Sequence, residues 1–393
     1  MNIMFVANFP IVPHRGGVQR VTNVLSKEML KRGHKVIFLC DTKSTIIDFD
    51  GFVCPQLFID VKSENEKSLR LSLAEIIDKY SIDRVICQAF NESIAKIITN
   101  LPKKLKDKVV TCSHVMPFEC DRLTRKRLLH NPHGNSRQII FKCASLIFPS
   151  IARKFFSNYE KRCLLSCLPL TTKACFLSEK FFPLVTKHIP DAPIDKFVAI
   201  GNPNTFSVQD TVPGERTREN ALLWVGRMED AQKNIAGFLK MWELFSKSHP
   251  DWKAYVVGDG SVLKKYLAKS KRGKWKNLSF EGPQADVAKY YRKCKYFCMT
   301  SFGESWGMVI TEAMTMGCVP VAMNSFPTLT DIIDSGKSGI VCDPSPKSMA
   351  EALEASITNH GEWKRLSAGA IEKVKQFDAG LVVNKWDALL KDL

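Results

Sequence analysis

Two cations and two carboxylates in the second half of the sequence are of the types that bind a sugar phosphate. Arg227 and Lys233 follow one strand-like segment, and Glu304 and Glu312 lie in the run Ser301–Glu312, which leads from another such segment into a helix. Arginine binds phosphate through a planar fork of donors and lysine through a point charge, while carboxylates accept hydrogen bonds from sugar hydroxyls. The combination predicts stabilisation of a departing diphosphate by cations rather than by a metal ion.

Glycines stand at the turns where a phosphate would approach the backbone. Gly226 ends the strand before Arg227, and Gly307 precedes the helix that starts at Met308. A helix N-terminus presents unpaired N–H groups and a positive field to an anion. Gly16-Gly17, at the first strand-to-helix turn of the chain, allows a similar approach, but it completes no G-x-G-x-x-G motif, so no nicotinamide site is predicted. Taken alone, each motif is also compatible with a solvated cation or an ordinary helix start.

His114 is a further candidate, because it directly follows the apolar strand Val109–Ser113. An imidazole at that position can hydrogen-bond the substrate or transfer a proton. A single histidine is more often a structural residue, and this alternative stays open.

The elements that must position these residues form two α/β halves. Strand Ile3–Ala7, a loop to Gly17, a helix that ends at Gly33 and strand His34–Cys40 make a β-loop-α-β unit. The Pro- and Gly-containing connector Asn202–Arg218 precedes a second βα series. We expect two doubly wound domains facing across a cleft, since ligands bind at the carboxyl ends of parallel strands. The other expected strands are Arg84–Gln88, Ala221–Val225, Ala254–Val257, Lys295–Thr300 and Val319–Met323, with helices at Ser68–Lys79, Ile235–Ser246, Met308–Met316 and Ala379–Leu393.

Composition limits the partners. Lys and Arg number 57 against 40 acidic residues, a formal charge of +17, and 14 basic against 4 acidic residues lie within 101–162. This excess predicts an anionic partner, either phosphorylated ligands or an acidic membrane surface. Nucleic acid is disfavoured because no reading motif or aromatic repeat accompanies the charge. Neither a signal peptide nor a spanning helix is expected, so we predict a cytoplasmic protein, peripheral on the inner face of the plasma membrane.

Together these motifs resemble glycosyltransferase family 4, over nearly the whole chain. The resemblance is carried by Gly16-Gly17, Gly201-Asn202-Pro203, Gly226-Arg227 with Lys233, Gly258-Asp259-Gly260 and the Glu304–Glu312 run. It implies a retaining, metal-independent enzyme of the GT-B fold. The implied domains are 1–201 on the acceptor side, 202–378 for the nucleotide sugar, and a helix at 379–393 that crosses back to the first domain.

The resemblance also assigns roles. Arg227 and Lys233 hold the donor diphosphate, Glu304 contacts the transferred sugar, Glu312 binds the ribose and His114 lies near the sugar. The catalytic candidates are therefore Glu304, Arg227, Lys233 and His114. The substrate-binding candidates are Gly16, Gly17, Gly226, Ser305, Gly307, Met308, Val309, Glu312, Pro283, Gln284 and Asn202.

Similarity to members that build bacterial surface polysaccharides predicts a UDP-sugar donor, a hexose or N-acetylhexosamine as the transferred sugar, and a glycan or lipid-linked diphosphate acceptor. No cofactor is expected. The alternatives are a nucleotide-sugar epimerase or a phosphorylase with the same fold, or a basic membrane-binding protein without enzymatic activity.

Overall fold

A computed structural model describes residues 1–12, 16–42, 54–118, 149–207 and 218–393. The chain forms two compact units. Of the described residues, the first comprises Met1–Phe118, Lys154–Thr205 and Ala379–Leu393, and the second comprises 149–153 and Phe206–Asp378. The first unit therefore extends to Thr205 and includes Asn202, which the sequence placed at the start of the second domain.

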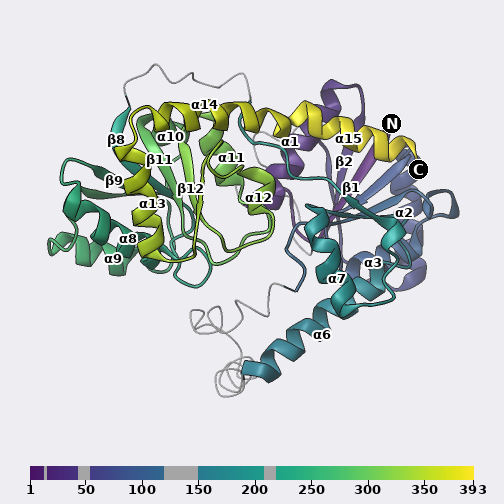
Figure 1. Cartoon of the computed structure of the whole chain (residues 1–393). Helices are drawn as coiled ribbons and strands as arrows, with labels where there is room; N and C mark the ends of the chain where they lie inside the picture. The colour runs from purple at the N-terminus through teal and green to yellow at the C-terminus, as the bar shows by residue number, and fades with distance from the viewer. Residues whose placement is uncertain (13–15, 43–53, 119–148, 208–217) are drawn as a thin grey trace. The chain divides into compact units, whose positions relative to one another are not determined.

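The first unit is built on a seven-stranded sheet in the order β3-β2-β1-β4-β5-β6-β7 (Figure 1). All of its strand pairs are parallel. The strand order reverses between β1 and β4, which makes this pair the switch point of the sheet. The strands are β1 Asn2–Ala7, β2 Lys35–Asp41, β3 Gln56–Ile59, β4 Arg84–Cys87, β5 Val109–Ser113, β6 Lys173–Phe176 and β7 Phe197–Ala199.

Helices cover this sheet, and side chains cap their starts. Asn65 caps α2 by accepting a hydrogen bond from Ser68 N, and Asn91 caps α3 by accepting one from Ile94 N. Gly33, at φ +81°, ends α1 in the left-handed conformation that glycine adopts without strain. The helices are α1 Gly17–Lys31, α2 Glu66–Lys79, α3 Glu92–Asn100, α6 Pro149–Cys167, α7 Phe182–His188 and α15 Ala379–Lys391.

The second unit is also built on a parallel sheet, which has six strands in the order β10-β9-β8-β11-β12-β13. Its switch point lies between β8 and β11. The strands are β8 Glu219–Val225, β9 Lys253–Val257, β10 Leu278–Gly282, β11 Cys294–Met299, β12 Val319–Met323 and β13 Ile340–Cys342. The helices are α8 Ile235–Ser248, α9 Leu263–Lys271, α10 Ala288–Lys293, α11 Met308–Thr315, α12 Leu329–Ile332, α13 Pro346–Thr358 and α14 Glu362–Val374.

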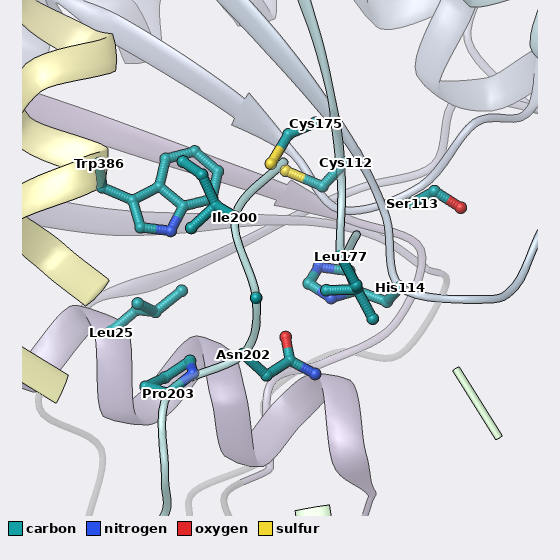
Figure 2. A pocket seen from close by; sticks show the side chains of 11 residues that line it. Leu25, Cys112, Ser113, His114, Cys175, Leu177, Ile200, Asn202, Pro203 and Trp386 are labelled. Carbon is teal, nitrogen blue, oxygen red and sulfur yellow. The ribbon is translucent and has the colours of Figure 1, made fainter. Parts of the chain in front are cut away.

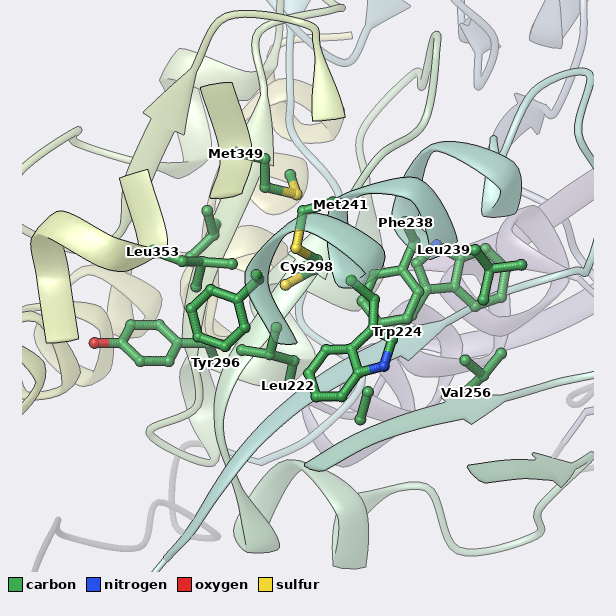
Figure 3. Packing of buried hydrophobic residues seen from close by; sticks show 14 of the residues in the cluster. Leu222, Trp224, Phe238, Leu239, Met241, Val256, Tyr296, Cys298, Met349 and Leu353 are labelled. Atoms are coloured by element: carbon green, nitrogen blue, oxygen red, sulfur yellow. The ribbon is translucent and has the colours of Figure 1, made fainter. Parts of the chain in front are cut away.

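An apolar core fixes β8 and β11 against the helices of the second unit (Figure 3). Trp224 of β8 and Tyr296 of β11 are buried with Phe238 and Met241 of α8 and Met349 of α13. Burying a large apolar side chain stabilises the fold by roughly 1.5–3 kcal/mol. This packing therefore fixes the positions of the strand ends that carry the candidate residues.

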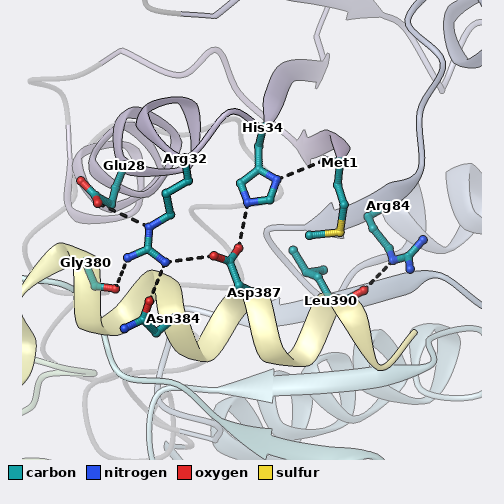
Figure 4. A network of polar contacts seen from close by, with 9 residues as sticks. All are labelled: Met1, Glu28, Arg32, His34, Arg84, Gly380, Asn384, Asp387 and Leu390. Atoms are coloured by element: carbon teal, nitrogen blue, oxygen red, sulfur yellow. Dashed lines mark hydrogen bonds and ion pairs between the residues drawn. The ribbon is translucent and has the colours of Figure 1, made fainter.

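The last helix is held in the first unit by a polar network (Figure 4). Arg32 donates to Asp387 at 2.9 Å and to the Gly380 carbonyl at 2.6 Å, and His34 Nε2 lies 3.0 Å from Asp387. Arg84 donates to the Leu390 carbonyl at 2.7 Å, near the C-terminal end of α15. The sequence assigned a terminal helix to 379–393 and expected it to join the first domain, and the contacts of α15 lie there.

The predicted fold class is confirmed: both units are α/β with parallel sheets. The expected strands and helices all occur, with ends that shift by one or two residues. The described cysteines are all free and buried, as expected of small apolar side chains. None of the described helices combines the length and the apolar character needed to span a bilayer.

Candidate active site

Two loops in the second unit bring the principal candidates together, one after β8 and one after β11. Two hydrogen bonds join them: Phe302 N donates to the Gln232 backbone carbonyl at 2.8 Å, and the Gln232 side-chain Nε2 donates to Gly303 O at 3.2 Å. Since β8 and β11 are the switch-point strands, the site lies where open parallel sheets bind ligands.

Lys233 and Glu304 meet in this site as an ion pair. Lys233 Nζ donates to Glu304 Oε1 at 2.5 Å, and Ser301 Oγ donates to the same oxygen at 2.8 Å. The Glu304 side chain is 10% exposed and that of Lys233 is 23% exposed. The carboxylate is therefore held in one orientation, while the ammonium keeps access to solvent and to an incoming anion.

Asn234 builds the turn that presents Lys233. It adopts the left-handed conformation (φ 52°, ψ 50°), which asparagine tolerates better than most residues. Its side chain accepts from Gly237 N at 3.1 Å, capping α8, and donates to Thr300 O at 2.9 Å. Thr300 Oγ1 in turn lies 2.9 Å from Asn234 O and accepts from Trp224 Nε1 at 3.2 Å. One buried residue thus couples the loops after β8 and β11.

Glycines allow the loop after β9 to approach the loop after β8. A Cβ on Gly258 would lie 2.0 Å from Gly226 O, and a Cβ on Gly260 would lie 2.3 Å from Met228 O. Met228 N donates to Asp259 O at 2.8 Å in this contact. Any side chain at these two glycines would push the segment around Arg227 away.

Arg227 differs from Lys233 in its contacts. Its guanidinium donates to Glu229 at 2.6 Å, and its side chain is 63% exposed. The resemblance assigned both cations to the donor diphosphate; among the described residues, Lys233 contacts Glu304, whereas Arg227 pairs with Glu229. Because exposed ion pairs contribute little free energy, this pair resists exchange with a phosphate only weakly.

Helix α11 begins beside Glu304. Gly307 caps it in the left-handed conformation (φ 86°), and Met308 and Val309 form its first turn. Ser305 O accepts from Thr328 Oγ1 at 3.1 Å, which ties down the segment before the helix. The N–H groups of a first helical turn have no partner within the helix, so this turn can receive an anion.

Glu312 and the segment after β10 complete the second-unit candidates. Glu312 is 3% exposed, and Tyr291 Oη donates to it at 3.4 Å. Gln284 donates to Glu281 O at 2.7 Å and accepts from Lys289 Nζ at 2.9 Å, whereas Pro283 is exposed. These contacts show where the three residues lie. The binding of ribose by Glu312 and of the donor by Pro283 and Gln284 stays a prediction.

In the first unit, His114 and Asn202 line the same small pocket, with Trp386 of α15 on its wall (Figure 2). His114 Nε2 lies 2.7 Å from Gln88 Oε1. A carboxamide oxygen only accepts, so Nε2 carries the proton and Nδ1 is the acceptor. Nδ1 is buried without a partner among the described residues. Burial lowers the pKa of His114 to about 4, so the imidazole is neutral near pH 7.

Gly16 and Gly17 lie at the start of α1. Gly16 is the N-cap residue and has an extended backbone, and no atom lies within 4 Å of a Cβ built on it. The open space agrees with close approach by a ligand, although any residue adopts this conformation. Residues 13–15 of the same loop lie outside the described part of the chain.

The sequence analysis missed several residues that shape the site. Ser301, which donates to Glu304, had no recognised motif role. Gln88, which fixes the His114 tautomer, follows β4, whereas His114 follows β5. Asn234 was not among the candidate residues, although asparagine just before a helix is the signal of a helix cap. Within the described residues, no group of three or more His, Cys, Asp or Glu side chains is arranged to hold a metal ion.

Comparison with known proteins places this site in a family. Residues 207–373, which contain both loops, match the family model "Glycosyl transferases group 1". This segment is therefore similar to the group 1 glycosyltransferases. The predicted family is thereby confirmed at group level.

Similar proteins agree with this assignment. An uncharacterized glycosyltransferase of Haemophilus influenzae is 25% identical over 50% of this chain and 55% of its own. An α-1,4-N-acetyl-D-galactosaminyltransferase of Campylobacter jejuni, which acts on an undecaprenol diphosphate-linked glycan, is 26% identical over 49% and 54%. The match therefore spans about half the length of these curated relatives.

Solved structures extend the likeness to the whole fold. Anabaena HepE in complex with UDP aligns over 100% of both chains with a TM-score of 0.73 at 15% identity. The GT-B fold expected from the sequence is confirmed.

Proposed function

We propose that the chain transfers a hexose or N-acetylhexosamine, with retention of anomeric configuration, from a UDP-sugar to a glycan or lipid-linked acceptor in polysaccharide biosynthesis. The observation that carries this proposal is the Lys233–Glu304 pair at the switch point of a group 1 domain. The nucleotide and the acceptor are inferred from similar proteins, one solved with UDP and one named for an undecaprenol diphosphate-linked acceptor.

Lys233 acts on the leaving group in this mechanism. When the bond between the anomeric carbon and the diphosphate breaks, negative charge grows on the phosphate oxygen. An ammonium group has three donors, so Lys233 can bind that oxygen while it keeps its bond to Glu304. Arg227 reaches the diphosphate by leaving Glu229. Preorganised cations lower the barrier because they need no reorganisation as the charge develops.

The transfer balances without another reactant. The anomeric carbon loses its bond to the diphosphate oxygen and gains one to the acceptor oxygen. The acceptor's proton leaves with the nucleotide diphosphate or passes to solvent. Glu304, held by Lys233 and Ser301, orients the sugar by accepting hydrogen bonds from its hydroxyls. These cations supply the charge that a metal would otherwise provide, and we propose that turnover persists in excess chelator.

The test compares Lys233→Ala with Lys240→Ala. Lys240 lies on the following helix and pairs with Glu243 at 3.3 Å, so it is a matched cation outside the site. We expect Lys233→Ala to lower kcat/KM for a UDP-sugar by about 100-fold or more and Lys240→Ala to leave it unchanged. Circular dichroism melts of both variants establish that the fold is retained. Wild-type turnover in a folded Lys233→Ala variant contradicts the proposal.

The same assay separates the alternatives. A screen of UDP-, GDP- and ADP-sugars with and without a glycan acceptor identifies the donor. An epimerase converts the donor without any acceptor, and a phosphorylase requires inorganic phosphate. Steep salt-dependent binding to anionic vesicles, together with no nucleotide-sugar binding in calorimetry, favours the non-enzymatic alternative.

We also propose that the protein contacts an acidic membrane surface, which would bring a lipid-linked acceptor within reach. The basic segment 101–162 supports this idea by its charge. Residues 119–148 of that segment lie outside the described part of the chain. The described remainder includes most of α6.

A further inference from the structure

Helix α6 presents apolar and basic side chains together on one exposed face. Phe155, Tyr159 and Leu165 are 50%, 48% and 44% exposed. Lys154 and Arg162 are exposed beside them. At 3.6 residues per turn, these positions share one side of the helix. We call this set the α6 face.

The opposite side of α6 is packed into the first unit. Cys163, Leu164 and Cys167 are buried, and Cys167 Sγ donates to Asn91 O at 3.3 Å. Glu160, the acidic residue of the described part of α6, accepts a hydrogen bond from Phe118 N at 2.7 Å. The helix is therefore anchored through one side, and its acidic group is turned to a backbone partner. The charge left on the α6 face is positive.

We infer that the α6 face lies on an anionic lipid surface. Tyrosine prefers the boundary between headgroups and acyl chains because its ring is apolar and its hydroxyl is polar. Lysine and arginine beside an apolar stripe add attraction to anionic headgroups. The basic excess of 101–162 in the sequence has the same sign. This inference rests on the proposed function, since it names the surface on which a lipid-linked acceptor would be met.

A nucleic acid or protein partner fits the α6 face less well. Nucleic acid needs cations that track a phosphate backbone, and here half-exposed apolar side chains separate Lys154 from Arg162. A protein interface is commonly depleted in lysine at its centre. The alternation of aromatic, aliphatic and basic groups along one helical side is typical of helices that lie in a membrane interface.

Flotation of the full-length protein with lipid vesicles tests the inference. We expect binding to phosphatidylglycerol-containing vesicles and little binding to pure phosphatidylcholine. Replacing Lys154 and Arg162 by Gln should lower the partition coefficient about 30-fold, given the usual contribution of each charge near an anionic surface. Replacing Tyr159 and Leu165 by Ser should lower it about tenfold by removing apolar contact.

Matched controls come from the same unit. Leu71 and Ile194 are 64% and 57% exposed and lie elsewhere in the first unit, so their double replacement by Ser removes exposed apolar side chains without changing the α6 face. Lys67 and Lys79, exposed on α2, serve as the charge control. Both control pairs should bind vesicles like the wild type.

Three results overturn the inference: equal binding to neutral and anionic vesicles, an equal loss of binding in control and α6 variants, or self-association that disappears with Leu165→Ser. Donor turnover in solution is measured for every variant. Lost vesicle binding with intact turnover supports the α6 face and leaves the proposed function standing. Vesicle binding by a protein that turns over no nucleotide sugar supports the face and contradicts the proposed function.

Discussion

Burial sets the chemistry of His114, a single residue on the wall of the first-unit pocket. Its pKa is lowered to about 4 because the charged form loses solvation. The unfolded chain has a histidine pKa near 6.5, so between pH 6.5 and 4 the unfolded state binds the proton more readily. Stability is therefore full above pH 6.5 and falls as the pH decreases through this window.

This gives a prediction for His114→Gln. The wild type should lose up to about 3 kcal/mol of unfolding free energy between pH 7 and pH 4 through this one group. The variant should lack that part of the loss, so the difference between the two proteins shrinks with acid. Urea unfolding at a series of pH values measures it. If the unfolding free energies of the two proteins fall in parallel as the pH decreases, protonation of His114 does not destabilise the folded state.

Other site residues show how far a sequence determines contacts. Lys233 and Glu304 were both predicted to bind the donor, and they meet because each follows a strand and the strands β8 and β11 are neighbours. The partner of Arg227 was not predictable, because an exposed arginine selects among nearby carboxylates with small energy differences. The role of Gln88 depends on a hydrogen bond between two strand ends, and that of Ser301 on a hydrogen bond within the loop after β11; no spacing rule reports either contact.

Among the elements, α8 shows a conflict between helix propensity and capping. Gly237 stands in its first turn, where alanine would normally be more favourable by about 1 kcal/mol. A Cβ there would lie 2.4 Å from Asn234 Nδ2, the atom that donates to Thr300 O. The glycine is therefore explained by the side chain of Asn234, which occupies the space.

A double-mutant cycle tests this account. Gly237→Ala alone should destabilise the protein by about 1–3 kcal/mol, since it displaces the cap and its bond to Thr300. In an Asn234→Gly background, which keeps the left-handed turn but removes the side chain, Gly237→Ala should instead stabilise by up to about 1 kcal/mol. Urea midpoints of the four proteins provide the measurement. An effect of the same sign in both backgrounds refutes the explanation.

Element boundaries were predicted best where the sequence is continuous and apolar. Val109–Ser113 and Val319–Met323 match β5 and β12 because each is a buried run bounded by polar or turn residues. The strands β7 and β13 are too short to give a period and were missed. The apolar stretch 163–177 contains the end of α6, a turn and β6. Tertiary packing, not local composition, divides it.

At the scale of the whole molecule, the chain returns to its first unit through α15, and this return depends on Asp387. Its carboxylate accepts from Arg32 and lies beside His34, with side chains 17%, 25% and 11% exposed. Removing one partner from such a half-buried network costs about 1–3 kcal/mol. The loss should appear in the first unit and leave the second unit unchanged, because the contacts of Asp387 all lie in the first.

The tryptophans make this prediction measurable. Of the seven in the chain, Trp386 alone lies in the first unit. In protein labelled with 5-fluorotryptophan, the fluorine signal that disappears in Trp386→Phe is that of the first unit. In Asp387→Ala this signal should report unfolding at lower urea, while the other six keep their midpoints. Asp78→Ala, which removes a 71% exposed carboxylate paired with Lys104 in the same unit, should move none of them appreciably. If all seven signals move together in Asp387→Ala, the two units unfold as one, and the return of α15 stabilises the whole chain instead of its first unit.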